Sequence, residues 1–151
     1  MALRGLLAMV QAGPVLLRVP TPMPTVALVV DDSMLIRYTV CRFLEERGYT
    51  VESATNGVEA LEVLQRVQPD LIVTDMQMPK MSGSELITAV KAKPETAAVP
   101  IIIVAGRASG FDESEKRANC TIYKDIDIEA QLAKALNSLP ARTSRAAAGK
   151  P

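Results

Sequence analysis

Three aspartates lie where apolar runs of the sequence end, and together their side chains could bind a cation. Asp31 and Asp32 follow the run Thr25–Val30, and Asp75 follows the run Leu71–Thr74. Three carboxylates at short range repel one another unless a cation or protons intervene. Oxygen ligands at an open, partly hydrated site favour Mg²⁺ over a dedicated Ca²⁺ cage. The residues therefore predict a magnesium site, provided that both runs end at the same place in the fold.

A cation at these aspartates would also permit phosphoryl chemistry. It would let a phosphoryl group approach a carboxylate despite their like charges. Asp75 could then accept that group as an acyl phosphate. Lys124 ends a later apolar run and offers a compact cation for a phosphate oxygen. Singly, an aspartate at a strand end is common and a lysine is usually a solvated surface charge, so the prediction depends on their joint placement.

Strand and helix patterns alternate along the chain and must position these residues. Short runs rich in Val and Ile suit strands buried on both faces of a parallel sheet, and apolar residues at helical spacing lie between them. The expected strands are Thr25–Val30, Tyr49–Ala54, Leu71–Thr74, Ile101–Val104 and Thr121–Tyr123. The expected helices are Ser33–Arg47, capped by Ser33 and followed by Gly48, then Val58–Val67, Ser84–Lys93, Asp112–Ala118 and Asp127–Leu139.

This alternation predicts an α/β fold of the flavodoxin-like, doubly wound type. We expect a five-stranded parallel sheet of order 2-1-3-4-5 with helices on both faces. In that order a ligand binds between the carboxyl ends of the first and third strands, where Asp31, Asp32 and Asp75 stand. We expect one domain over residues 24–139, a flexible N-terminal extension over residues 1–23 and a disordered tail over residues 140–151.

Composition excludes several classes of function. The 151 residues include no histidine, which excludes a Ser-His-Asp triad, a His-ligated metal site and a phosphohistidine carrier within the chain. With 17 basic and 17 acidic residues, nothing favours direct binding to nucleic acid or to an anionic membrane. No apolar stretch could span a bilayer, and no signal peptide is expected. Cys41 and Cys120 form no CxxC motif and indicate reduced thiols in a cytoplasmic protein.

Several motifs make the chain resemble the receiver (CheY-like) domain of two-component response regulators, over about Pro24 to Leu139. The most specific is DMQMPKMSG, preceded at the expected distance by the acidic pair. The motifs are VVDDS (29–33), LEERGY (44–49), ATNGVEAL (54–61), PDLIVTDMQMPKMSG (69–83), VPIII (99–103) and Lys124.

The resemblance implies a role for each matched residue. Asp75 would be phosphorylated by a phosphohistidine on a separate histidine kinase or histidine phosphotransfer protein. Asp32 would bind Mg²⁺ directly and Asp31 through water, with Asp75 and the backbone carbonyl of Gln77 as further ligands. Lys124 would pair with the phosphate. The protein would therefore be a phosphoacceptor and not an enzyme in the usual sense.

Three positions depart from the family pattern. Members usually carry Thr or Ser after the fourth strand, an aromatic residue three positions before the lysine and proline after it. Here these positions hold Ala105, Thr121 and Asp125. Tyr123 lies on the same side of its strand as Thr121 and would substitute imperfectly for the aromatic residue. Without proline, a cis bond after Lys124 would cost about 2.5–4 kcal/mol, so we expect a trans bond and a shifted lysine.

Two functions remain open from the sequence. The leading prediction is a stand-alone receiver that binds a downstream protein through the segments 112–118, 121–123 and 127–139. The alternative is a pseudo-receiver scaffold whose state does not depend on phosphate, which Ala105 and Thr121 favour. A phosphatase of the aspartyl-phosphate type is disfavoured, because Gln77 stands where such enzymes have a second aspartate. The segment before Lys124 is shorter than usual, so its helix should be short or irregular, and homodimer formation stays open.

Overall fold

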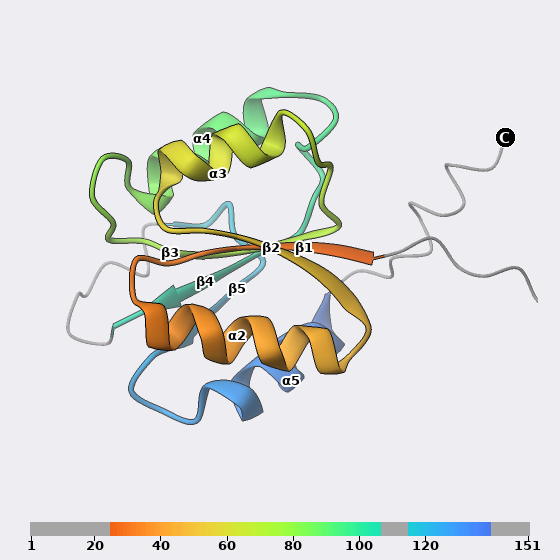
Figure 1. Ribbon diagram of the computed structural model, residues 1–151, viewed down its shortest axis with the longest axis vertical. Coiled ribbons are helices and arrows are strands. Elements are labelled where there is room, and N and C mark those ends of the chain that lie inside the picture. The colour runs from red at the N-terminus through yellow and green to blue at the C-terminus, as the bar shows by residue number, and fades with distance from the viewer. Residues whose placement is uncertain (1–24, 107–114, 140–151) are drawn as a thin grey trace, which may run out of the picture.

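The computed structural model describes residues 25–106 and 115–139, and strands alternate with helices along them (Figure 1). The elements are β1 (Thr25–Val30), α2 (Met34–Glu46), β2 (Tyr49–Ala54), α3 (Gly57–Leu64), β3 (Leu71–Asp75), α4 (Gly83–Ala92), β4 (Ile101–Ala105), β5 (Cys120–Tyr123) and α5 (Ile128–Ser138). The expected N-terminal extension and C-terminal tail lie outside the described residues. No helix in the two described ranges is both long and apolar enough to cross a membrane.

All strands belong to one parallel sheet of order β2-β1-β3-β4-β5, which confirms the predicted fold class. Helices α3 and α4 cover one face of the sheet, and α2 and α5 cover the other (Figure 1). The register pairs Val30 of β1 with Thr74 of β3, so Asp31 and Asp75 follow at neighbouring positions of one sheet edge. The topology thus brings the two acidic strand ends together.

Apolar side chains form a core on each face of the sheet. Every residue of β3 and of β4 is buried, as expected for strands covered on both sides. The α3 and α4 side contains Leu28, Ile72, Leu86 and Ile101, and the α2 and α5 side contains Val29, Leu44, Ile102 and Leu132. Both clusters meet the same strands, so core packing fixes where the strands end.

Local signals in the sequence set most helix boundaries. The Ser33 hydroxyl accepts a hydrogen bond from the Ile36 N–H at 3.3 Å, which confirms the predicted cap of α2. Gly48 follows that helix with a φ of 94°, the left-handed conformation that glycine adopts without strain. Helix α3 ends at Leu64 and not at the predicted Val67. Its last turn tightens, because the Arg66 N–H donates to the Val63 carbonyl at 3.0 Å.

The connection from β4 to β5 differs from the prediction. We expected a helix over Asp112–Ala118, of which only the part from Glu115 lies within the described residues. That part forms a turn, so the prediction is wrong there. The buried Glu115 carboxylate accepts the Arg117 N–H at 3.2 Å and the Arg117 guanidinium at 2.9 Å. A side chain that bonds to nearby backbone in this way competes with the helical pattern.

Candidate functional site

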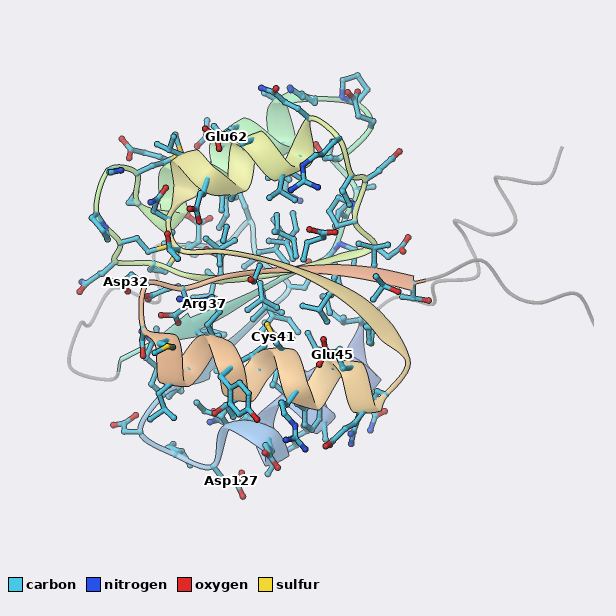
Figure 2. All side chains as sticks on the ribbon, viewed as in Figure 1. Asp32, Arg37, Cys41, Glu45, Glu62 and Asp127 are labelled. Carbon is cyan, nitrogen blue, oxygen red and sulfur yellow. The ribbon has the colours of Figure 1, made fainter. Side chains whose placement is uncertain are left out.

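Three carboxylates converge beyond the ends of β1 and β3. One oxygen each of Asp31, Asp32 and Asp75, which we call the acidic cluster, lie within 4.8 Å of one another. Asp31 and Asp75 are buried, whereas Asp32 is exposed. Asp32 lies beyond the end of β1, at the end of the sheet where α2 begins (Figure 2). The structure therefore brings together the three aspartates that the sequence singled out.

Asp31 is held by its own chain neighbours. Its Oδ1 accepts the Ser33 N–H at 2.8 Å, and its backbone N–H donates to the Ala54 carbonyl at 3.1 Å. Its carbonyl accepts a hydrogen bond from the Arg37 guanidinium at 2.8 Å. Its Oδ2 is buried and has no hydrogen-bond partner among the described residues. One carboxylate oxygen is thus fixed in place with its bonding capacity unused.

The environment disfavours the charged form of Asp31. Burial, together with repulsion from Asp75, raises the pKa of Asp31 to about 6 from its ordinary value of 3.8. The Ser33 N–H and the Lys124 ammonium oppose this rise only in part. A cation beside Oδ2 would remove the repulsion and occupy the unused oxygen, so the donor set fits a hard metal ion.

Lys124 closes the acidic cluster from the end of β5. Its Nζ lies 3.0 Å from Asp75 Oδ2 and 3.5 Å from Asp31 Oδ2. Burial lowers the pKa of Lys124, but the hydrogen bond to Asp75 and the two carboxylate charges outweigh it, so the pKa lies above its usual value. The side chain remains an ammonium. Asp75 therefore already has a cationic partner before any phosphate is present.

The loop after β3 approaches Asp75 closely. The Gln77 N–H donates to Asp75 Oδ1 at 3.3 Å, while the Gln77 side chain is exposed. Gly83 begins α4 directly against this loop, because a Cβ at Gly83 would collide with the Asp75 carbonyl oxygen. The Gly83 N–H also donates to the Met76 carbonyl at 2.8 Å. The acceptor residue is thus supported from the start of α4, a role for Gly83 that the sequence reasoning missed.

The three positions that depart from the family pattern lie beside Lys124. Ala105 is buried at the end of β4, and its backbone pairs in register with Tyr123 of β5. Tyr123 packs against the core on the α3 and α4 side, and Thr121 is half-buried. None of the described peptide bonds is cis, so the bond between Lys124 and Asp125 is trans, as expected. The switch roles of Ala105 and Thr121 stay predictions.

Two polar side chains near the site were missed by the sequence reasoning. Arg37 bonds to the Asp31 carbonyl, and Gln131 bonds to the backbone of Tyr123 just before Lys124. Figure 2 shows Arg37 on α2, at the same end of the sheet as Asp32. Neither residue carries a sequence signal, because each acts through backbone atoms that only the fold brings near.

Known proteins share this arrangement. A family model for the response regulator receiver domain matches residues 27–137. Sporulation initiation phosphotransferase F of Bacillus subtilis (strain 168) is 32% identical over 103 residues, which are 68% of this chain and 83% of that protein. The structure of the chemotaxis response regulator CheY4 of Vibrio cholerae superposes with a TM-score of 0.68 at 30% identity. It covers 78% of this chain and 100% of that chain.

Other relatives are much longer than the matched region. Response regulator MprA of Mycobacterium sp. (strain KMS) is 34% identical over 128 residues, and the chain spans 53% of that protein. The chain spans 11% of the gliding motility regulatory protein of Myxococcus xanthus, at 41% identity. The family model covers most of the described residues, and the sheet order and acidic cluster agree with it. The chain therefore belongs to the response regulator receiver domain family.

Proposed function

We propose that this receiver domain accepts a phosphoryl group on Asp75 with the help of Mg²⁺. The observation that carries the proposal is the convergence of the three carboxylates of the acidic cluster within 4.8 Å, with the Lys124 ammonium 3.0 Å from Asp75. This arrangement combines a nucleophilic carboxylate, a set of oxygen ligands and a cation for a phosphate oxygen.

The ligands proposed for Mg²⁺ are Asp31, Asp32, Asp75 and the backbone carbonyl of Gln77. The buried and unbonded Oδ2 of Asp31 supports this assignment, since a structural carboxylate would normally use both oxygens. The ion, when bound, would neutralise charge on the carboxylates and on the transferred group. Asp32 is exposed and can therefore reach the ion without desolvation of its carboxylate.

The transfer step makes an oxygen–phosphorus bond at Asp75. A carboxylate oxygen attacks the phosphorus of a phosphohistidine, the phosphorus–nitrogen bond breaks, and its electron pair stays on the imidazole, which takes up a proton. Lys124 then pairs with a phosphate oxygen in place of the carboxylate. The donor must be a separate histidine kinase or histidine phosphotransfer protein, because this chain has no histidine. The domain is then a cytoplasmic phosphoacceptor and not a conventional enzyme.

The phosphorylated domain would act on a downstream protein. Similarity to a protein named as a phosphotransferase, over 83% of its length, supports a role in phosphoryl transfer between proteins. That the domain acts alone, as the sequence analysis expects, stays a prediction. Pull-down of partners by the beryllofluoride-treated and untreated protein tests it, and identical partners in both states contradict a phosphate-driven signal.

The acceptor role is tested by mass spectrometry after incubation with Mg²⁺ and acetyl phosphate. We expect one added phosphoryl group, absent without Mg²⁺ and absent in Asp75→Asn. Asp125→Asn is the matched control, since Asp125 is an exposed carboxylate outside the acidic cluster, and it should be labelled as the wild type is. Labelling of Asp75→Asn at the wild-type rate would exclude Asp75 as the acceptor.

A second candidate function is a scaffold whose state does not depend on phosphate. The buried Ala105 favours it, because a methyl group cannot bond to phosphate where the family usually has a hydroxyl. A lost hydrogen bond to a charged group costs about 1.5–3 kcal/mol. Hydrogen exchange with and without beryllofluoride separates the two functions. Changes confined to the loop after β3 favour the scaffold, and changes that extend into β5 and α5 favour the switch.

A further inference from the structure

The Gln131 side chain of α5 pairs with the outer edge of the sheet. The Tyr123 N–H donates to Gln131 Oε1 at 3.0 Å, and Gln131 Nε2 donates to the Tyr123 carbonyl at 2.8 Å. Strand β5 is an edge strand, so no further strand satisfies these backbone groups. One side-chain amide therefore makes the two hydrogen bonds that a neighbouring strand would make.

These bonds fix the peptide that leads into Lys124 from both sides. The Tyr123 carbonyl and the Lys124 N–H belong to the same peptide group. The carbonyl accepts from Gln131, and the N–H donates to the Ala105 carbonyl at 2.9 Å. Strand β4 and helix α5 thus hold the two sides of this peptide, so the backbone before Lys124 has little freedom to shift.

Gln131 also spans the turn that follows the lysine. Its Nε2 lies 3.3 Å from the carbonyl of Asp127, the residue that caps α5. The turn between Lys124 and Asp127 contains no proline, so no ring restricts its backbone. A contact from the end of β5 to the start of α5 therefore limits the movement of this turn.

We propose that Gln131 is a positioning residue, which holds the Lys124 backbone so that its ammonium reaches Asp75. The inference rests on the proposed phosphoryl acceptance and names a residue that governs it. Lysine has a long flexible side chain, so a fixed Cα decides which positions its ammonium can occupy. Small displacements of a group that contacts the reacting atoms reduce rates strongly. Gln131 itself does not touch Asp75, so it acts through Lys124.

The test uses variants that remove the two hydrogen bonds in steps. Gln131→Met keeps the length and helix propensity of the side chain but neither bond, and Gln131→Glu keeps only the acceptor. Asn137→Ala is the matched control, because it removes an exposed amide from the same helix. The rate of Asp75 phosphorylation by acetyl phosphate and the affinity for Mg²⁺ are measured for each folded variant.

We expect Gln131→Met to slow phosphorylation about 5- to 50-fold and to leave the Mg²⁺ dissociation constant within about twofold. Gln131→Glu should fall between Gln131→Met and the wild type. In a Lys124→Ala background Gln131→Met should have no further effect, because the group that it positions is gone. A lower thermal stability with an unchanged rate would overturn the proposal and leave Gln131 as an edge contact alone. An equal loss in the Lys124→Ala background would overturn it as well.

A second measurement does not depend on phosphorylation. Nuclear magnetic resonance of ¹⁵N-labelled lysine reports the exchange of the Lys124 ammonium protons in the metal-free protein. We expect faster exchange in Gln131→Met than in the wild type and in Asn137→Ala. Unchanged exchange would overturn the positioning role. If the wild type accepts no phosphoryl group, the proposed function fails, while this measurement still decides whether Gln131 positions Lys124.

Discussion

Replacing Asp31 by asparagine should stabilise the metal-free protein at neutral pH. The side chain is buried, and its ionised form is disfavoured by burial and by Asp75. An asparagine oxygen can still accept the Ser33 N–H, which now bonds to Oδ1 at 2.8 Å. The substitution therefore removes the charge and keeps the hydrogen bond that orients the side chain.

The magnitude follows from the raised pKa of Asp31. A rise from 3.8 to about 6 corresponds to about 3 kcal/mol, at 1.36 kcal/mol per pKa unit. Between these two values the folded protein binds more protons than the unfolded chain, so stability falls as pH rises through that window. Above about pH 6 the cost is complete. The attraction from Lys124 is already contained in the raised value, so Asp31→Asn should gain about 3 kcal/mol at neutral pH.

The assay is urea unfolding in EDTA at a series of pH values. The difference between Asp31→Asn and wild type should be about 3 kcal/mol at neutral pH and should shrink toward zero near pH 4. Other carboxylates titrate in both proteins and cancel in this difference. Mg²⁺ should narrow or reverse the difference, because it stabilises the folded wild type by binding. A variant less stable than the wild type in EDTA, or a difference independent of pH, would refute the reasoning.

Three further substitutions have effects on the free energy of unfolding that urea titration can measure. Arg117→Ala should cost about 1–3 kcal/mol, because it leaves the buried Glu115 carboxylate without its guanidinium partner, whereas Arg117→Lys should cost less. Ser82→Ala removes the capping box of α4 and should cost about 1 kcal/mol. Gly83→Ala should cost about 1–3 kcal/mol and should also slow labelling of Asp75, whose carbonyl the new methyl group would meet.

The acidic cluster was predictable because simple rules fix strand ends. Buried runs of Val and Ile predicted β1 and β3, and the sheet order placed their carboxyl ends together. Asp31 and Asp75 follow those runs directly, so the register of the sheet sufficed to bring them near each other. The position of Lys124 followed in the same way from β5. No knowledge of side-chain packing was needed for these residues.

The turn before β5 was not predictable, because a tertiary contact overrides the local pattern. The Arg117 guanidinium donates to Glu115, to the Thr88 hydroxyl at 2.7 Å and to the Ser84 carbonyl at 3.3 Å. Ser84 and Thr88 belong to α4, some thirty positions away in the chain. Periodicity within residues 112–118 contains no information about these partners, so the predicted helix fails where it can be compared.

The acidic and basic parts of the site are supported in different ways. Asp75 ends an interior strand in which every residue is buried, so many core contacts hold it. Lys124 ends β5, a strand of four residues at the sheet edge, of which only Ile122 is buried. An edge strand with few core contacts needs other bonds to fix its end. The two bonds from Gln131 and the bond from Lys124 to Ala105 supply them. Substitutions in α5 should therefore change phosphate pairing before they change metal binding.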